Sequence, residues 1–447
     1  MADSIAQQVR AAGIVGAGGA GFPTHVKFDS QVEIAIANGA ECEPLLRCDK
    51  AVMRERGAEV LDGLSLLGQA TGARRLIIAL KAHYAPVVAA VREAIRSSFP
   101  RVELFLLDNY YPAGDEQVLV NAVTGRVVPE GGIPLNVGVV VDNVVTLRQV
   151  ARAVRHGEAV TSRPLTVAGA VRQPLTCELP IGAPLQLAID RAGGPTVSHW
   201  VAIDGGPMMG RLAAAANEPI TKKTSGIIVL PNNHPLVQSK TSSIEREVKL
   251  GRTVCCQCRM CTDLCPRHLL GHDISPHLAM RTLLAAGLTE APSSHITAAY
   301  LCCLCGVCDT YACTLGLSPR RVFEHMRAQL TAAGVRNPHQ RKELTPHEFQ
   351  ALRRVPTERL IQRLGLGDYA RAPEVVDWGA VEAPRVRLLL SQHTGASAQP
   401  VVAVGQRVER GELVAEIPEG KLGARLHASI SGTVTAIDGH AVEIARS

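Results

Sequence analysis

The chain has 447 residues, of which 46% are hydrophobic and 20% charged, with a mean hydropathy of +0.11. This length exceeds what one hydrophobic core serves, so we expect two to four globular domains. The net charge of +6 is spread along the chain, which argues against nucleic acid as a partner. No stretch approaches the roughly 20 apolar residues of a transmembrane segment, and residues 1–12 lack the design of a secretory signal. We therefore expect a cytoplasmic protein, whose 13 cysteines indicate metal chemistry in a reducing compartment.

Near its N-terminus the chain carries a glycine-rich loop from Gly13 to Thr24, followed by Lys27. Its five glycines let backbone N–H groups approach a phosphate that a Cβ would keep away. Lys27 would add a positive charge. A plain structural turn is the alternative interpretation.

Residues 1–160 then alternate between short apolar runs and amphipathic segments, which predicts a mainly parallel sheet with helices on its faces. The apolar runs are read as strands because they are short and bounded by turn residues. The helical segments carry apolar residues at helical spacing. We expect strands at 32–36, 76–80, 102–107 and 137–141, and helices at 51–68, 86–97 and 147–156.

Polar residues cluster just after these strands, where ligands bind in open α/β sheets. Each group by itself could be a helix cap or a turn. All three together, downstream of a glycine-rich loop, predict a cofactor pocket. The groups are Asn38, Glu41 and Glu43; Tyr111, Gly114, Asp115 and Glu116; and Asp142 and Asn143.

Residues 161–235 predict a small β-grasp-like module with strands at 165–171 and 201–204 and a helix at 181–192. Met208 and Met209 lie in a tight loop, where we expect them to pack and not to ligate a metal. The polar stretch 236–250 is expected to be a linker.

Two cysteine runs dominate residues 251–375. The first ends in Cys265-Pro266 and has the bacterial ferredoxin spacing for a cubane cluster; the second has one extra residue before its last cysteine, Cys313. In two-cluster proteins the fourth cysteine of each run ligates the other cluster. We therefore expect two 4Fe-4S clusters, one held by Cys255, Cys258, Cys261 and Cys313 and the other by Cys302, Cys305, Cys308 and Cys265.

Zinc sites and disulfides are the alternatives for these cysteines. Zinc typically takes two separated Cys-x-x-Cys pairs, and disulfides require an oxidising compartment. Cys256 and Cys303 lie beside the expected ligands but out of register, so we expect them to pack near the clusters without ligating them.

The spacer between the runs carries Leu278, Leu283, Leu284 and Leu288 at helical spacing, which favours an α-helical two-cluster ferredoxin. His268, His272 and His277 are expected to be neutral capping or surface residues. Arg320, Arg321 and Arg327 could offset cluster charge, form a docking face or simply be solvated.

Residues 376–447 predict a small β domain with strands at 401–404, 413–417, 424–427 and 433–437. Its turns resemble those of the barrel-sandwich fold of biotinyl and lipoyl domains. Lys421 lies near the usual position of a modified lysine, but its neighbours do not form a modification hairpin. We expect a scaffold.

The glycine-rich loop, Asn38 to Pro44, Tyr111 to Glu116 and Asp142 to Val144 resemble the FMN and NADH segments of the flavoprotein subunit of respiratory complex I. Ala40 departs from that pattern, which has an acidic residue there. The stretch from Tyr111 to Pro134 is closer to the C subunit of the Rnf complex. Ala40 to Pro44 and the domain order are most similar to the cobalamin reductase family of the propanediol-utilisation microcompartment.

This resemblance implies a multidomain α/β protein in which NADH reduces FMN, and electrons pass through two clusters to an acceptor. The implied domains are an FMN/NADH-binding α/β domain (1–160), an SLBB module (161–235), a linker (236–250), a ferredoxin-like domain (251–375) and a barrel-sandwich domain (376–447). The implied FMN-binding residues are Gly16, Gly18, Gly19, Gly21, Lys27, Asn38, Glu41, Tyr111, Gly114, Asp115 and Asn143, and the implied NADH-binding residues are Phe22, Glu43 and Glu116.

The acceptor implied by the resemblance is cobalamin, reduced for an adenosyltransferase inside a bacterial microcompartment, where a shell protein is a further expected partner. One alternative is an Rnf-like component that feeds a ferredoxin, a membrane partner or an enzyme activase. The other is a non-catalytic relay or scaffold that carries clusters only. No cobalamin-binding motif of the Asp-x-His-x-x-Gly type occurs in the sequence.

Overall fold

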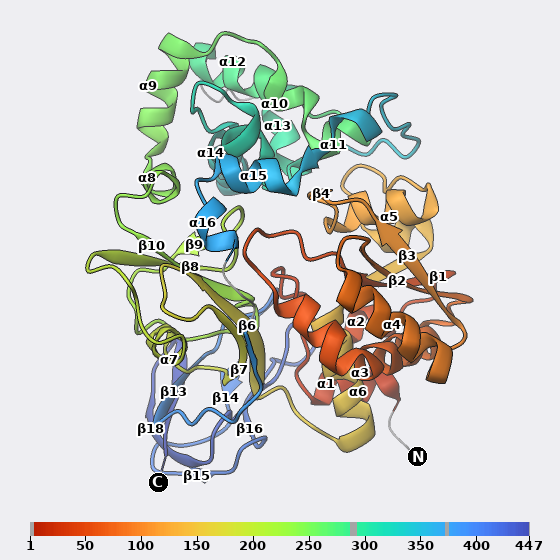
Figure 1. Ribbon diagram of the computed structural model, residues 1–447, viewed down its shortest axis with the longest axis vertical. Coiled ribbons are helices and arrows are strands. Elements are labelled where there is room, and N and C mark those ends of the chain that lie inside the picture. The colour runs from red at the N-terminus through yellow and green to blue at the C-terminus, as the bar shows by residue number, and fades with distance from the viewer. Residues whose placement is uncertain (1–3, 287–292, 372–374, 447) are drawn as a thin grey trace.

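The computed structural model describes residues 4–286, 293–371 and 375–446. Figure 1 shows an α/β unit beside a β module, with the cysteine-rich helices at one end of the molecule and the C-terminal strands at the other. The predicted multidomain α/β architecture is confirmed. Among the helices of the described residues, none combines the length and apolar character that crossing a bilayer requires.

The N-terminal unit is built on a parallel sheet of order β3-β2-β1-β5. Ile36 pairs with Ile77 on one side and Val141 on the other, so the strands' carboxyl ends meet at one edge. Helices cover both faces, which is why β1 and β2 are nearly continuous apolar runs. The strands are β1 (Ile34–Gly39), β2 (Arg75–Lys81), β3 (Val102–Leu107) and β5 (Val139–Asn143), and the helices are α1 (Ile5–Ala11), α2 (His25–Phe28), α3 (Cys48–Thr71), α4 (Ala85–Ser98), α5 (Glu116–Thr124), η1 (Pro134–Val137) and α6 (Val144–His156).

The second unit is a mixed sheet of order β12-β7-β6-β10-β8-β9, with α7 (Leu185–Arg191) packed on β10. The sequence patterns missed β7, β10 and β12. The stretch expected to be a linker is largely helical and forms α8 (Pro235–Thr241) and the start of α9 (Ile244–Val254). The strands are β6 (Ser162–Gly169), β7 (Leu175–Pro180), β8 (Trp200–Asp204), β9 (Arg211–Leu212), β10 (Gly226–Pro231) and β12 (Val375–Asp377).

The cysteine-rich unit is helical in its described part, as the spacer pattern predicted. Leu278, Leu283 and Leu284 lie in α12 (Pro276–Ala286), whereas Leu288 lies outside the described residues. One short strand, β11 (Val355–Pro356), leaves this unit and pairs with β4 (Tyr110–Tyr111) of the N-terminal unit. The remaining helices are α10 (Met260–Asp263), α11 (Pro266–Leu269), α13 (Ser294–Thr297), η2 (Ala298–Leu301), η3 (Val307–Ala312), α14 (Pro319–Ala332), η4 (Ala351–Arg353), α15 (Thr357–Arg363) and α16 (Gly367–Ala370).

The C-terminal unit folds as two small sheets of order β13-β19-β18-β15 and β14-β16-β17. The strand expected at 401–404 does not form; Val401 and Val404 are exposed, and the pairing residues are the two before them. The strands are β13 (Arg385–Leu389), β14 (Gln399–Pro400), β15 (Arg407–Val408), β16 (Leu413–Glu416), β17 (Leu426–His427), β18 (Gly432–Ile437) and β19 (Ala441–Ala445).

The close packing of α3 on α6 leads to a testable prediction. A Cβ added at Gly63 would lie 2.0 Å from the carbonyl oxygen of Leu147, whereas a Cβ at Gly57 in the same helix would meet nothing within 4 Å. We predict that Gly63→Ala destabilises the N-terminal unit by about 1–3 kcal/mol through overpacking. Gly57→Ala should be neutral or stabilise it by up to about 1 kcal/mol.

Urea unfolding, with hydrogen exchange of the α3 and α6 peptides as the local readout, measures both effects. Equal losses of stability in the two variants would contradict the inferred close contact.

Candidate functional site

The glycine-rich loop leaves α1 and turns back on itself between Val15 and Pro23, which form an antiparallel bridge. The N–H of Gly16 donates to the Phe22 carbonyl at 2.8 Å, and the N–H of Gly21 to the Gly16 carbonyl at 3.2 Å. Gly18 and Gly19 are exposed at the tip, where Gly19 has a φ of +105° that a residue with a side chain rarely adopts. The tip therefore presents backbone to a ligand without side chains in the way.

Residues far away in sequence hold this loop in place, and the sequence patterns did not reveal them. The N–H of Ala17 donates to the Thr146 hydroxyl at 2.8 Å, and the Ala17 carbonyl accepts from Arg163 at 2.6 Å. Arg163 is buried and also donates to the Lys222 and Thr224 carbonyls. The loop is thus anchored by α6 and by the second unit.

The C-terminal unit contacts the same loop. The N–H of Thr394 donates to the Gly21 carbonyl at 2.9 Å, and its hydroxyl donates to the Ala20 carbonyl at 3.0 Å. Buried Lys222 bridges the Gly13 carbonyl and the Arg425 carbonyl, both at 2.6 Å. The C-terminal unit therefore serves as a scaffold for the loop, in line with the role expected for it.

Lys27 and Asn143 lie beside the loop at the carboxyl end of β5. The Lys27 ammonium is 3.0 Å from the buried Asp142 carboxylate and donates to the Val141 carbonyl at 2.6 Å. The Asn143 amide caps α6 and donates to Asp49 at 2.8 Å. A Cβ on Gly18 would lie 3.8 Å from the Asn143 Cβ, so the loop tip and this strand end face each other.

The end of β1 is tied to the turn before α5. Asn38 donates to the Gly114 carbonyl at 2.9 Å, and the N–H of Gly114 donates to the Cys42 sulfur at 2.7 Å. A Cβ at Gly114 would lie 2.5 Å from the Ala40 carbonyl, so only glycine fits this approach. Burial raises the pKa of Cys42 to about 12, which keeps it a neutral thiol.

Glu41 is a half-buried carboxyl group in this pocket. Burial, followed by the nearby Asp49 carboxylate, raises the pKa of Glu41 to about 8. Burial likewise raises the pKa of Asp49 to about 6, although its hydrogen bond from Asn143 opposes that shift. Glu41 therefore carries a proton at neutral pH.

Three residues implied to bind FMN or NADH instead engage the neighbouring units with their polar atoms. The Glu43 carboxylate accepts from the N–H groups of Met208 and Met209, both at 2.8 Å. The Tyr111 hydroxyl donates to the Cys305 carbonyl at 2.7 Å. Asp115 caps α5 and forms a two-point ion pair with Arg267, at 2.5 and 3.0 Å.

Phe22 and Glu116 are the other two residues implied to bind NADH. Phe22 is half-buried within the glycine-rich loop, and Glu116 is exposed in the first turn of α5. The assignment of Phe22, Glu43 and Glu116 to NADH stays a prediction. Met208 is buried and packs as expected, whereas Met209 is exposed.

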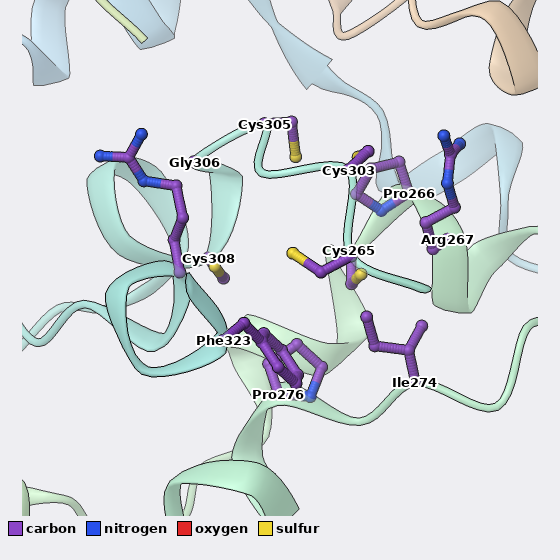
Figure 2. Close-up of a pocket in the computed structure, with 12 residues that line it drawn as sticks. Cys265, Pro266, Arg267, Ile274, Pro276, Cys303, Cys305, Gly306, Cys308 and Phe323 are labelled. Carbon is purple, nitrogen blue, oxygen red and sulfur yellow. The ribbon is translucent and has the colours of Figure 1, made fainter. Parts of the chain in front are cut away.

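Five cysteines of the two runs line one pocket, and four of them, Cys265, Cys302, Cys305 and Cys308, form one ligand set predicted from the crossed ferredoxin pattern. Figure 2 shows Cys265, Cys305 and Cys308 pointing toward one space, with Phe323 and Ile274 closing its other side. Cys302 lines the same pocket, and so does Cys303, for which the sequence predicts packing nearby. A donor set made of thiols alone fits an iron–sulfur cluster.

The other four predicted ligands are Cys255, Cys258, Cys261 and Cys313. Cys255 and Cys313 pack against the same hydrophobic cluster, and α10, which carries Cys261, contacts η3, the helix that ends just before Cys313. No three His, Cys, Asp or Glu side chains within residues 4–286, 293–371 and 375–446 come close enough to hold one metal ion. The ligand assignments of both sets remain predictions.

The two cysteine runs share one backbone conformation. Gln257 and Leu304, each two residues after the first cysteine, both have a φ of +57°. Arg259 and Gly306, each directly after the second ligand, have φ values of +67° and +79°. Alternation of left- and right-handed residues turns successive N–H groups into one concavity, which favours the negative charge of thiolates and iron–sulfur clusters.

The extra residue before Cys313 is absorbed by a change of helix type. The first run reaches Cys265 through the α-helical turn α10, whereas the second reaches Cys313 through the π-helix η3. A π-helix accommodates one more residue in a turn without displacing the chain beyond it. Cys265 and Cys313 consequently end their turns in the same extended conformation.

The three arginines after the second run form neither a free docking face nor a solvated one. Arg320 pairs with Asp309 at 3.0 Å and donates to the Met208 carbonyl at 3.2 Å. Arg321 donates to the Ser239 carbonyl, and Arg327 to the carbonyls of Ala299 and Cys302. They bind the segments that surround the cysteine pocket.

Comparison with known domain families gives four matches along the chain. The Nuo51 FMN-binding domain matches residues 9–152 and the SLBB domain residues 164–212. The 4Fe-4S dicluster domain matches residues 254–318, and the RnfC barrel sandwich hybrid domain residues 379–447. These matches confirm the expected fold class, with FMN and two 4Fe-4S clusters as the cofactors of an oxidoreductase.

Curated relatives extend the match over the whole chain. Cobalamin reductase PduS of Salmonella typhimurium is 45% identical over 100% of this chain and 97% of its own length, and PduS of Citrobacter freundii is 42% identical with the same coverage. The C subunit of the Na(+)-translocating ferredoxin:NAD(+) oxidoreductase complex of Acetobacterium woodii is 37% identical over 62% of this chain and 60% of its own length. The chain belongs to the PduS cobalamin reductase family.

Proposed function

We propose that this protein is an NADH-dependent oxidoreductase that delivers electrons through FMN and two 4Fe-4S clusters to cobalamin. The observation that carries the proposal is the contact between the N-terminal unit, which matches an FMN-binding domain, and the cysteine-rich unit. The loop after β3 touches the cysteine pocket directly, because the Tyr111 hydroxyl donates to the Cys305 carbonyl. An FMN-binding domain thus adjoins a set of four thiols, and full-length similarity to two cobalamin reductases supports the acceptor.

Each cofactor can be assigned a set of the chain's own residues. The exposed amides of the loop tip and Lys27 would bind the FMN phosphate, and Asn38, Glu41 and Asn143 would line the space for the ring. Each set of four thiols would hold one cluster. When bound, FMN supplies a centre that accepts a hydride and returns single electrons, and the clusters supply one-electron centres.

Around these centres the protein controls protons, charge and water. Glu41 holds a proton at neutral pH, so it would donate a hydrogen bond to the flavin edge without adding a negative charge there. Buried apolar residues such as Leu360 and Leu366 pack with Tyr111 and Cys305 and keep water from the contact between these two units. A low dielectric environment strengthens the electrostatic effect of each buried group on its cofactor.

The second set of thiols lies near the surface, which supports it as the exit for electrons. Cys256 and Cys258 are exposed, and so are Val254, Met260 and Leu315, each within two residues of a predicted ligand. By contrast, Cys265, Cys305 and Cys308 are buried, and the Cys305 carbonyl accepts a hydrogen bond from Tyr111 of the N-terminal unit. We propose the order FMN, buried cluster, surface cluster, acceptor.

The family relationship further supports a site of action in the cytoplasm, inside a bacterial microcompartment, with an adenosyltransferase and a shell protein as partners. The Rnf-like alternative has a shorter match, since the Acetobacterium woodii protein aligns with 62% of the chain.

The protonated state of Glu41 predicts a pH dependence of stability. A carboxyl group whose pKa is raised on folding binds more protons in the folded state, so the free energy of unfolding falls as pH rises through this range. In flavin-free protein, Glu41 should lower stability progressively from about pH 4.5 to about pH 8, with Asp49 contributing only up to about pH 6.

Urea titrations at pH 6 and pH 8 should therefore show that Glu41→Gln gains stability relative to the unsubstituted protein as the pH rises. Glu33→Gln is the matched control, because the ion pair with Arg126 lowers the pKa of Glu33 and takes its titration out of this range. An unchanged pH dependence in Glu41→Gln would contradict the assignment.

The crossed pairing of cysteines predicts the iron content of double variants. Cys265→Ala and Cys305→Ala should each lose about half of the iron, and together no more, because both would belong to one cluster. Cys265→Ala combined with Cys261→Ala should lose nearly all of it. Iron and acid-labile sulfide are measured after anaerobic reconstitution, with Cys256→Ala as the control that retains both clusters. The opposite pattern would mean that each run holds its own cluster.

The proposed reaction is tested with protein purified anaerobically and loaded with FMN and iron. NADH, hydroxocobalamin, ATP and an adenosyltransferase are added, and formation of adenosylcobalamin is followed by its spectrum. We expect product only with NADH and with intact cysteines. Bleaching of flavin and clusters without cobalamin reduction would point to another acceptor, as in an Rnf-like component. No bleaching at all would overturn the NADH site.

A further inference from the structure

The N-terminal unit reaches the cysteine pocket through a second polar contact, the ion pair between Asp115 and Arg267. Asp115 begins α5 just after the turn that carries Tyr111, and Arg267 follows Cys265-Pro266. Arg267 lines the pocket formed by Cys265, Cys302, Cys305 and Cys308. Figure 2 shows Arg267 beside Pro266 and Cys303.

This ion pair is almost completely removed from water. The side chains of Arg267 and Asp115 are 8% and 13% exposed, and two hydrogen bonds of 2.5 and 3.0 Å join the guanidinium to both carboxylate oxygens. Two-point pairs of this kind fix both position and orientation. Because screening by water is weak there, the separate charges of the two groups act strongly on anything held in the pocket.

We propose that Asp115 and Arg267 set the reduction potential of the cluster in this pocket, with Arg267 raising it and Asp115 limiting that rise. A reduced cluster carries one more negative charge than an oxidised one, so a nearby guanidinium stabilises the reduced form. The carboxylate, held by the unit that binds FMN, partly cancels that effect. Asp115 is then a positioning residue between the two cofactors, where family resemblance had implied a flavin ligand.

The proposal rests on the proposed function in one respect: the pocket must hold a cluster. It does not depend on NADH, FMN or cobalamin, because the potential can be titrated with dithionite. A failure of the cobalamin assay and a failure of this proposal are therefore distinguishable.

A second ion pair between the same two units provides a matched control. Arg341 donates to Glu130 at 2.6 Å, and the Glu130 side chain is 1% exposed. Glu130 also accepts from the N–H of Asp273. Neither Glu130 nor Arg341 lines the cysteine pocket. Loss of this pair tests the effect of loosening the contact between the units by itself.

The experiment measures the midpoint potential of the pocket cluster by redox titration followed by electron paramagnetic resonance. The signal of that cluster is identified as the one absent from Cys305→Ala. Asp115→Asn should shift its potential upward, since Arg267 then lacks its counter-charge; asparagine still caps α5. Arg267→Gln should shift it downward. Glu130→Gln should leave it unchanged, and the signal of the other cluster should move little in all three variants.

Shifts of Asp115→Asn and Arg267→Gln in the same direction, or no shift in either, would overturn the proposal. So would a Glu130→Gln variant that behaves like Asp115→Asn, because the effect would then come from domain contact. Arg267→Lys and Asp115→Glu keep the charges. If Asp115→Asn, Arg267→Gln, Asp115→Glu and Arg267→Lys all lose the cluster, the ion pair serves cluster assembly and the proposal fails. If Asp115→Glu and Arg267→Lys keep the cluster at a near-normal potential, the proposal is supported.

Discussion

The site depends on burial of polar groups where the loops after β1 and β3 meet the cysteine-rich unit and the loop between β8 and β9 beside it. The side chains of Glu43, Tyr111 and Asp115 extend from the N-terminal unit and form hydrogen bonds at the edge of the cysteine pocket or in the loop beside it. A buried polar group without a partner costs free energy, so these contacts accept only one relative placement of the units. The short β4–β11 ladder secures the same junction with backbone hydrogen bonds.

The glycine-rich loop shows the same principle on a smaller scale. The amides of Gly18 and Gly19 at the loop tip, which face a ligand, cannot also stabilise the loop. The groups beside the tip do so: the Ala17 N–H donates to Thr146, and loop carbonyls accept from Arg163 of the second unit and Thr394 of the C-terminal unit. The β modules therefore have a physical role in the flavin half of the protein, although they supply none of the residues implied to bind its cofactors.

The two cysteine runs differ in length but reach the same end state. Both runs have residues in the left-handed backbone conformation at equivalent positions. The inserted residue of the second run is accommodated in η3. Asp309, within that π-helical turn, is paired with Arg320, which in turn contacts the carbonyl of Met208. Met208 accepts that contact while its own N–H is held by Glu43. The π-helical turn that takes up the inserted residue is thus linked, through Arg320 and Met208, to Glu43 of the N-terminal unit.

Much of this protein is determined by local sequence. Alternation of apolar strands and amphipathic helices predicted the parallel sheet. The pattern is clear because β1 and β2 are buried on both faces and are therefore almost entirely apolar. Cysteine spacing grouped four of the five cysteines that line the pocket, since a turn of fixed length sets where each sulfur points, and their assignment as cluster ligands stays a prediction. Short strands such as β14 and the helical stretch 235–254 were misjudged, because two paired residues or a polar helix leave little periodic signal.

Only the tertiary structure decided what the polar residues at the strand ends contact. The sequence around Tyr111 and Asp115 is the same whether these side chains face a flavin or a cysteine pocket. Which of the two they contact depends on a partner more than 150 residues away. Arg163, Thr146 and Thr394 gave no motif, because a single side chain that binds a distant backbone N–H or carbonyl has no spacing to detect. Local patterns determine which groups the chain offers, and packing between distant segments determines which of them meet.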